Sequence, residues 1–228
     1  HASNVFGNIL PIQAIFELSK NYNAITLLDA AQTAGILEID AHILKADFIV
    51  FAGHKTLYGP SGIGGFVYNS DIVLYPILFG GTGINSEDID MPLFLPERFE
   101  VGSKNTLGII GLYLSMKWLA DQENKSLVNK EKRNFELLIE VLKNYDIKLL
   151  YSGNNVGIVS CLFKNYSPQD IGFILNENNI AVRTGLQCAP LAHKFMGTLP
   201  EGTVRFSVGC FNCKDDFIVL NNVLEELF

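Results

Sequence analysis

The sequence predicts an α/β protein with a mostly parallel sheet in its larger part and a smaller α+β part at its C-terminal end. Two short apolar runs, residues 25–28 and 48–51, each end in polar residues, as buried parallel strands do. A segment with helical spacing precedes the first run. A charged stretch over 121–133 separates this part from a second series of strands and helices.

The elements of the first part follow from spacing and turn residues. A helix is expected to begin at Leu10-Pro11, where proline fits the first turn, and to end near residues 21–23. The glycine-rich turn over 58–65 precedes a third strand at 66–68, and a polar loop runs from Gly80 to about Arg98. Loops of that length usually carry function. Helical spacing returns over 105–119.

The charged stretch over 121–133 is typical of a seam between domains. We therefore assign residues 1–120 to a large domain and residues 121–228 to a small α+β domain. The helices expected there are at 135–142, from Ser167-Pro168 onward and at 212–227, and the strands are at 147–151, 157–163, 180–183 and 203–207.

Composition excludes several classes of protein. The chain has 228 residues, 48% of them hydrophobic, which is enough for a substantial core and excludes disorder. Lys and Arg number 17 against 24 Asp and Glu, so no basic surface for nucleic acid or anionic lipid is expected. No apolar run approaches the roughly 20 residues of a spanning helix, and a soluble protein is predicted.

Cysteine usage points to a reducing compartment. The four cysteines, Cys161, Cys188, Cys210 and Cys213, are too sparse for a disulfide framework, so we predict a cytoplasmic protein. The first residue is His1 rather than Met, and we expect the numbering to begin inside a longer gene product.

Three polar side chains follow the two buried strands. Asp29 and Gln32 come after the first strand and Lys55 after the second, and the carboxyl ends of parallel strands share one edge of a sheet. A carboxylate, an amide and a lysine there suit pyridoxal 5'-phosphate, since lysine forms a Schiff base and aspartate keeps the pyridine nitrogen protonated. Taken singly, each residue is better explained as a turn cap or a solvated side chain.

Several motifs stand together in a characteristic order. They are Leu28-Asp-Ala-Ala-Gln32, Phe51-Ala-Gly-His-Lys55 and Arg183-Thr-Gly-Leu-Gln-Cys-Ala189, joined by the stretches 1–7, 98–106 and 202–207. With them the chain resembles, over essentially its whole length, the cysteine desulfurases of the class V aminotransferase family. The resemblance implies the type I aminotransferase architecture, pyridoxal phosphate as cofactor and a homodimer.

The resemblance also implies roles for individual residues. Lys55 would carry the cofactor, and Arg205 would bind the substrate carboxylate, a task that suits a guanidinium. Asn4 would border the cofactor and that carboxylate, and Arg183 is a weaker candidate beside them. The further residues that the resemblance places on the cofactor are Asp29 at the pyridinium nitrogen, Gln32 at the ring hydroxyl, His54 at the phosphate and Ser103 at the phosphate of the partner subunit.

Cys188 matches the family's persulfide cysteine, and Gly185 with Ala189-Pro190 indicates a loop around it. The implied reaction converts L-cysteine to L-alanine, leaves the sulfur on Cys188 as a persulfide and passes it to an acceptor protein. Selenocysteine lyase, cysteine sulfinate desulfinase, another class V aminotransferase-like enzyme and a non-catalytic truncated partner remain alternatives.

The chain departs from the family pattern in several places. Ala52 replaces the serine of the Ser-x-His-Lys motif, which removes a phosphate contact, and Ser103 replaces a common threonine. Cys210 and Cys213 form a CxxC pair, which we interpret as incidental, and no metal site is predicted. The family has a segment before His1 that supplies further cofactor contacts, so we expect this chain alone to bind the cofactor poorly.

Overall fold

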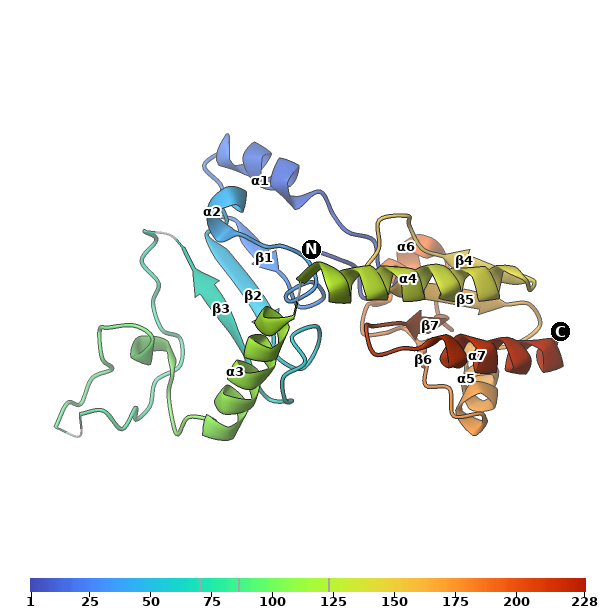
Figure 1. Cartoon of the computed structure of the whole chain (residues 1–228). Coiled ribbons are helices and arrows are strands. Elements are labelled where there is room, and N and C mark those ends of the chain that lie inside the picture. Colours follow the sequence, from blue (N-terminus) through green and yellow to red (C-terminus); the bar gives the residue numbers. More distant parts are fainter. Residues whose placement is uncertain (70, 86, 123) are drawn as a thin grey trace.

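The chain folds around two β-sheets that are separated in space and joined by α3 (Thr106–Asp121) and α4 (Asn124–Lys143) (Figure 1). The computed structural model describes residues 1–69, 71–85, 87–122 and 124–228. The first sheet has the strand order β1-β2-β3 and the second has the order β4-β5-β7-β6. Together with its neighbours in solved structures, reported below, this arrangement confirms the predicted fold class.

The first sheet is mixed. Strand β1 (Leu27–Asp29) pairs in parallel with β2 (Phe48–Ala52), as predicted, and places Asp29 opposite Val50. Strand β3 (Gly64–Tyr68) runs antiparallel to β2, because the short connection between them cannot cross back to the other end of the sheet. Strand β1 begins two residues later than the apolar run suggested.

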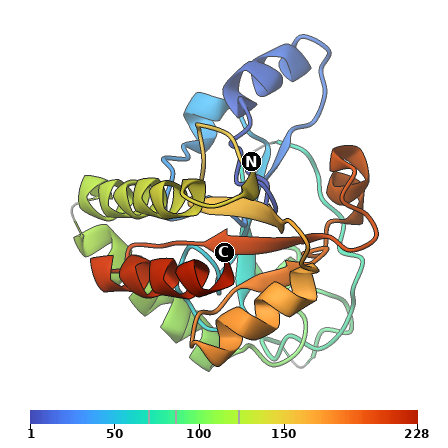
Figure 2. The ribbon, with the colours of Figure 1, turned by 90° about the vertical axis from the view of Figure 1, so that its right-hand side faces the viewer.

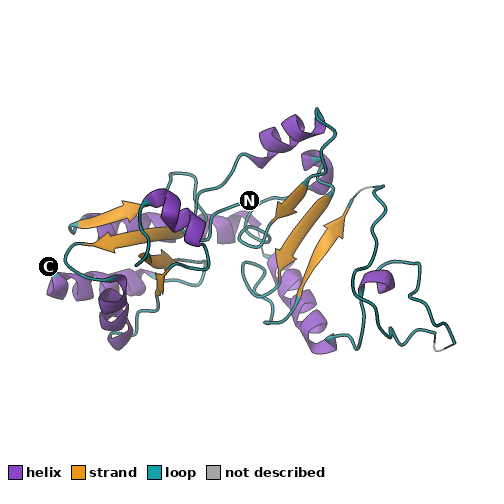
Figure 3. Cartoon of the chain, turned by 180° about the vertical axis from the view of Figure 1, so that it is seen from behind, coloured by secondary structure: helices purple, strands orange, loops and turns teal. Residues whose placement is uncertain are grey.

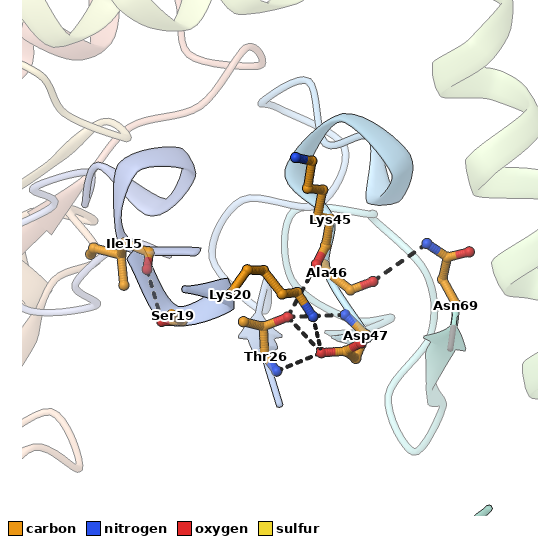
Figure 4. A network of polar contacts seen from close by, with 8 residues as sticks. All are labelled: Ile15, Ser19, Lys20, Thr26, Lys45, Ala46, Asp47 and Asn69. Carbon is orange, nitrogen blue, oxygen red and sulfur yellow. Dashed lines mark hydrogen bonds and ion pairs between the residues drawn. The ribbon is translucent and has the colours of Figure 1, made fainter. Parts of the chain in front are cut away.

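Helix α1 (Ile12–Lys20) is tied to the beginning of β2 by a polar network (Figure 4). Asp47 Oδ2 accepts hydrogen bonds from Lys20 Nζ at 2.6 Å and from the backbone and hydroxyl of Thr26 at 2.7 and 2.9 Å. Burial alone would raise the pKa of Asp47, but these hydrogen bonds outweigh it and lower the pKa to about 2. The short helix α2 (Ala41–Leu44), capped by Asp40, was not predicted.

The connection between β3 and α3 contains little regular structure. As predicted, the segment from Gly80 to Arg98 is a loop, apart from the 3-10 turn Glu97–Phe99. Ser86, which falls within it, lies outside the described residues. Many apolar side chains of the connection between β3 and α3 are exposed, among them Ile77, Phe79 and Leu93.

The second sheet is antiparallel throughout. Its strands are β4 (Ile147–Leu150), β5 (Ile158–Phe163), β6 (Arg183–Gly185) and β7 (Thr203–Ser207). Helices α4 and α7 (Lys214–Leu227) lie side by side against it (Figure 2). The core between them is made of side chains such as Leu138, Leu142, Val159, Leu220 and Leu224.

The charged stretch expected to be a domain seam is helical. Helix α4 begins at Asn124 and runs through that stretch, with its later apolar residues on the sheet. Glu123 lies outside the described residues, and the domain boundary near residue 120 stays a prediction. Helix α5 (Pro168–Glu177) begins as predicted, because Ser167 and Asp170 form a capping box. Helix α6 (Pro190–Met196) was not predicted, since its sequence resembles a loop.

The first nine residues join the two sheets (Figure 3). The carbonyl of Val5 accepts from Ser160 Oγ of β5 at 2.7 Å, and Gly7 accepts from the backbone of Val156 at 3.0 Å. At the other end, the amino group of His1 donates to the carbonyl of Asp29 at 2.9 Å. This segment therefore fixes the end of β1 relative to the second sheet.

A cluster of aromatic rings makes a second contact between the part of the chain around the first sheet and the part around the second sheet. Trp118 of α3 stacks on Phe211, which lies between β7 and α7, with ring centroids 5.8 Å apart. The ring of Tyr58 meets Trp118 and Phe211 edge-on, and its hydroxyl lies 3.5 Å from Cys210 Sγ. Within the part of the chain that the structure describes, no helix is long and apolar enough to cross a membrane.

We expect Gly202→Ala to destabilise the fold, because an added Cβ would collide with the carbonyl of Gly185 and Gly202 has a φ of +81°. Urea denaturation should show a loss of about 1–3 kcal/mol in unfolding free energy, as for other overpacked sites. Gly153→Ala, where an added Cβ meets nothing within 4 Å, is the matched control. Equal unfolding free energies for both variants would contradict this interpretation.

Candidate active site

A cavity of about 530 Å³ lies between the two sheets and brings together most of the predicted site residues. From the first nine residues and the first sheet, Asn4, Gln32 and Lys55 line it. From the second sheet and its loops, Cys188 and Arg205 line it. Side chains that are 201 residues apart in the sequence thus face one space, of a volume usual for small-molecule sites.

Lys55 belongs to a tight turn directly after β2. The amide of Gly59 donates to the carbonyl of Gly53 at 2.7 Å, and the amide of Tyr58 donates to the carbonyl of Lys55 at 2.9 Å. A Cβ at Gly59 would stand 2.9 Å from the Gly53 carbonyl oxygen, so the turn requires glycine there. The turn holds the exposed Lys55 at the edge of the cavity.

Arg205 of β7 is suited to bind an anion. Its Nη1 donates to the carbonyl of Asn4 at 2.9 Å, while its Nε is buried without a hydrogen-bond partner among the described residues. Burial, and then the charge of Arg183, lower the pKa of Arg205, whereas Cys188 opposes this shift. An arginine is nevertheless charged at any physiological pH, so a half-buried cation lines the cavity.

Cys188 is exposed on the loop between β6 and α6 and is a free thiol. The side chain amide of Asn4 donates to the carbonyl of the preceding residue, Gln187, at 2.7 Å. Asn4 therefore contacts both the cysteine loop and Arg205. The structure places a nucleophile, a cation and an amine on one cavity.

Three predicted site residues do not line this cavity in the described part of the chain: Asp29, His54 and Ser103. Asp29 ends β1 and its Oδ1 accepts from the backbone of Ala31 at 2.9 Å. His54 is exposed beside Lys55, and Ser103 is exposed in the segment before α3. Their assigned roles, and those of the cavity residues, remain predictions.

Other residues of the cavity were missed from the sequence. Thr56 lines it with a buried hydroxyl that has no hydrogen-bond partner among the described residues, and Gln187 lines it beside Cys188. Tyr58 and Glu131 also line it. The position of Thr56 next to Lys55 could have indicated that it lines the site. Nothing in the charged sequence around Glu131 indicates that this residue lines the site.

Glu131 is a carboxyl group in a largely buried environment. It lines the cavity from α4, and burial raises its pKa to about 7. Burial, followed by the contact with Cys210, also raises the pKa of Tyr58, which lines the same cavity. Within the described residues, no group of three or more His, Cys, Asp and Glu side chains is placed to hold a metal ion.

The fold and the cavity define an α/β protein with a cavity between its two sheets that is lined by a lysine, an arginine and a free thiol. A sequence profile described as "Aminotransferase class-V" matches residues 1–220. The chain belongs to the class V aminotransferase family.

Individual relatives are similar over the whole chain. A "Probable cysteine desulfurase" of Pyrococcus abyssi is 34% identical over 100% of this chain and 58% of its own length, and a "Cysteine desulfurase" of Wigglesworthia glossinidia brevipalpis is 30% identical over 100% and 56%. The apo structure of a cysteine desulfurase from Thermococcus onnurineus NA1 superposes with a TM-score of 0.92 at 31% identity, covering 100% of this chain and 58% of its own.

The cysteine desulfurase CsdA of Escherichia coli, solved with an S-sulfonic acid, has a TM-score of 0.90 at 26% identity over 99% of this chain and 57% of its own. These likenesses confirm the predicted type I architecture. The chain spans less than two thirds of the length of the relatives that it matches.

We expect the stability of the chain to fall as the pH rises from about 4.5 to 7, because the unfolded chain releases the Glu131 proton in that range while the folded chain retains it. Glu131→Gln has no proton to release, so it should be more stable than the wild type by about 1–3 kcal/mol at pH 8 and similar at pH 5. Chemical denaturation at both pH values measures this. Glu136→Gln, at an exposed position of the same helix, is the control, and an E131Q effect independent of pH would contradict the interpretation.

Proposed function

We propose that this chain belongs to a cysteine desulfurase, which converts L-cysteine to L-alanine and takes the sulfur on Cys188. The observation that carries the proposal is the common cavity of Lys55, Cys188 and Arg205, which supplies an amine, a thiol and a carboxylate-binding cation. Relatives with 30–34% identity named cysteine desulfurases support the same activity.

The residues present fit pyridoxal 5'-phosphate. Lys55 provides the amine that would hold it, Gln32 an amide for its ring hydroxyl, and Asp29 a carboxylate at the adjoining strand end. The buried Thr56 hydroxyl and Arg205 Nε lack protein partners among the described residues, as donors reserved for a ligand would. When bound, the cofactor stores the electron pair released at the substrate Cα.

In this proposal the protein side chains position the substrate and move its protons. Arg205 binds the carboxylate of L-cysteine through a charge-assisted hydrogen bond, and Asn4 orients Arg205 through its carbonyl. Lys55 Nζ removes the Cα proton as a general base. Asn4 also holds the Cys188 loop, so one residue positions both the substrate-binding arginine and the thiol.

The sulfur step is a displacement at sulfur. The thiolate of Cys188 attacks the substrate sulfur, a new S–S bond forms, and the Cβ–S bond of the substrate breaks. Its electron pair remains on the organic fragment, which takes up a proton and leaves as L-alanine. L-cysteine and the Cys188 thiol thus give L-alanine and a Cys188 persulfide, with no external oxidant or reductant.

The proposal includes partners and location. We propose that the protein is a cytoplasmic homodimer that passes its sulfur to an acceptor protein. Exposed apolar side chains on α3 support a covering partner on that face: they include Leu107, Ile110, Tyr113 and Leu114. The acceptor is defined only by its chemistry, which is a nucleophile able to take sulfur from an exposed cysteine.

We expect Lys55→Ala and Cys188→Ser in the full-length gene product to lower alanine release from L-cysteine by about 10²–10⁴-fold, the usual contribution of a catalytic proton-transfer group or nucleophile. Alanine is measured by amino-acid analysis, with Lys45→Ala as an exposed lysine control. Alanine release that survives in C188S but not in K55A would contradict the proposal and favour a lyase acting on selenocysteine or a sulfinate.

We expect Leu114→Glu in the full-length gene product to weaken self-association, because it places a charge on the exposed apolar face of α3. Light scattering coupled to size-exclusion chromatography should show a dimer for the wild type and a shift toward monomer for the variant. Asn176→Glu, which adds the same single charge at an exposed position of α5, is the control. A monomeric wild type would overturn the homodimer.

A further inference from the structure

The backbone around Cys188 has an unfavourable conformation. Gln187 and Cys188 have φ angles of +43° and +59°, and Gly185 before them has +88°. Two successive non-glycine residues in the left-handed region are uncommon, and they persist only where the surrounding structure fixes them. The question is which contacts fix this loop.

The side chain of Gln187 supplies those contacts. It is only 5% exposed. Its Nε2 donates to the carbonyls of Arg183 at 3.2 Å and Thr203 at 3.1 Å, which lie on the paired strands β6 and β7. Its Oε1 lies 2.9 Å from His193 Nε2. All polar atoms of this amide therefore have partners next to the cysteine.

His193 of α6 is the residue that completes the network. It is fully buried, and its Nδ1 lies 2.8 Å from Thr198 Oγ1. Because the amide oxygen of Gln187 only accepts, His193 Nε2 must carry the proton, and Nδ1 accepts from the Thr198 hydroxyl. Burial lowers the pKa of His193 and favours this neutral form.

The Thr203 hydroxyl does not replace His193. It is 3.3 Å from Gln187 Oε1 but only 3.0 Å from Ser160 Oγ. Ser160 donates its own proton to the carbonyl of Val5, so it accepts from Thr203. A hydroxyl has one proton, and that of Thr203 is committed to Ser160. His193 is then the donor that orients the Gln187 amide.

We propose that Gln187 and His193 are positioning residues that hold the Cys188 thiol for sulfur transfer. The inference rests on the proposed function and adds two residues to it. His193 orients the Gln187 side chain, and Gln187 fixes the loop on β6 and β7 and, through its carbonyl, on Asn4. Since Asn4 also accepts from Arg205, the thiol and the carboxylate-binding residue are held in one connected network.

The test compares His193→Phe, which keeps a ring but has no donor, with His193→Gln, whose amide is able to donate to Gln187 Oε1. Both are made in the full-length gene product. We expect H193F to lower kcat for alanine release by about 10–100-fold, the scale of a small misplacement of a reacting group, with KM changed less than about twofold. H193Q should recover most of kcat. His42→Phe, an exposed histidine of α2, is the control.

A second readout does not depend on turnover. The rate at which iodoacetamide alkylates Cys188, followed by peptide mass spectrometry, should change at least about threefold in H193F and return toward the wild-type rate in H193Q. A wild type that releases no alanine would refute the proposed function, and the alkylation rates would still test the positioning role.

Two results would overturn the inference. One is an unchanged kcat and alkylation rate in H193F, and the other is an equal loss in H193F and H193Q, which would indicate a purely structural role. If H193F does not fold, Thr198→Val removes only the hydroxyl that fixes Nδ1. It should then lower kcat and alter alkylation in the same direction, with Thr198→Ser restoring both, and unchanged values would refute the proposal.

Discussion

The site depends on one residue, Asn4, whose side chain and backbone bind two different elements. Asn4 donates from its amide to the carbonyl of Gln187 and accepts at its own carbonyl from Arg205. These two hydrogen bonds connect the cysteine loop, β7 and the first residues of the chain. Because the same segment also contacts the carbonyl of Asp29, the end of β1 is fixed against the second sheet and the cavity has a defined shape.

The two sheets contribute different chemistry to that cavity. The carboxyl ends of the parallel strands β1 and β2 bring Gln32 and Lys55 together, as open α/β sheets commonly do. The antiparallel sheet contributes Cys188 and Arg205 from a loop and a strand that are adjacent through the β6–β7 pairing. The rings of Tyr58 and Trp118 contact Phe211, so the turn that carries Lys55 packs against the part of the chain that carries the thiol and the arginine.

Sequence alone predicted most of the helices and strands, because strand ends and motif order are local signals. Of the eight site residues predicted from the sequence, five line the cavity. Asp29 followed from the same pattern, yet it lies outside the lining of the cavity in the described part of the chain. Glu131 and Gln187 were not predicted, because their importance comes from burial and from contacts with distant residues. His193 was not predicted as a site residue either, because only the folded chain connects it to Cys188 through Gln187. The charged stretch over 121–133 looked like a seam because the apolar face of α4 lies mainly in its later turns.

The central claim is that Cys188 receives the sulfur of L-cysteine. The most direct measurement is the mass of the peptide that contains Cys188 after the full-length protein, loaded with pyridoxal phosphate, reacts with L-cysteine without an acceptor. The account predicts that this peptide gains the mass of one sulfur atom, that the gain disappears on reduction, and that alanine is released in equal amount. Alanine release with no added sulfur on Cys188, or with the sulfur on Cys210 or Cys213, would contradict it.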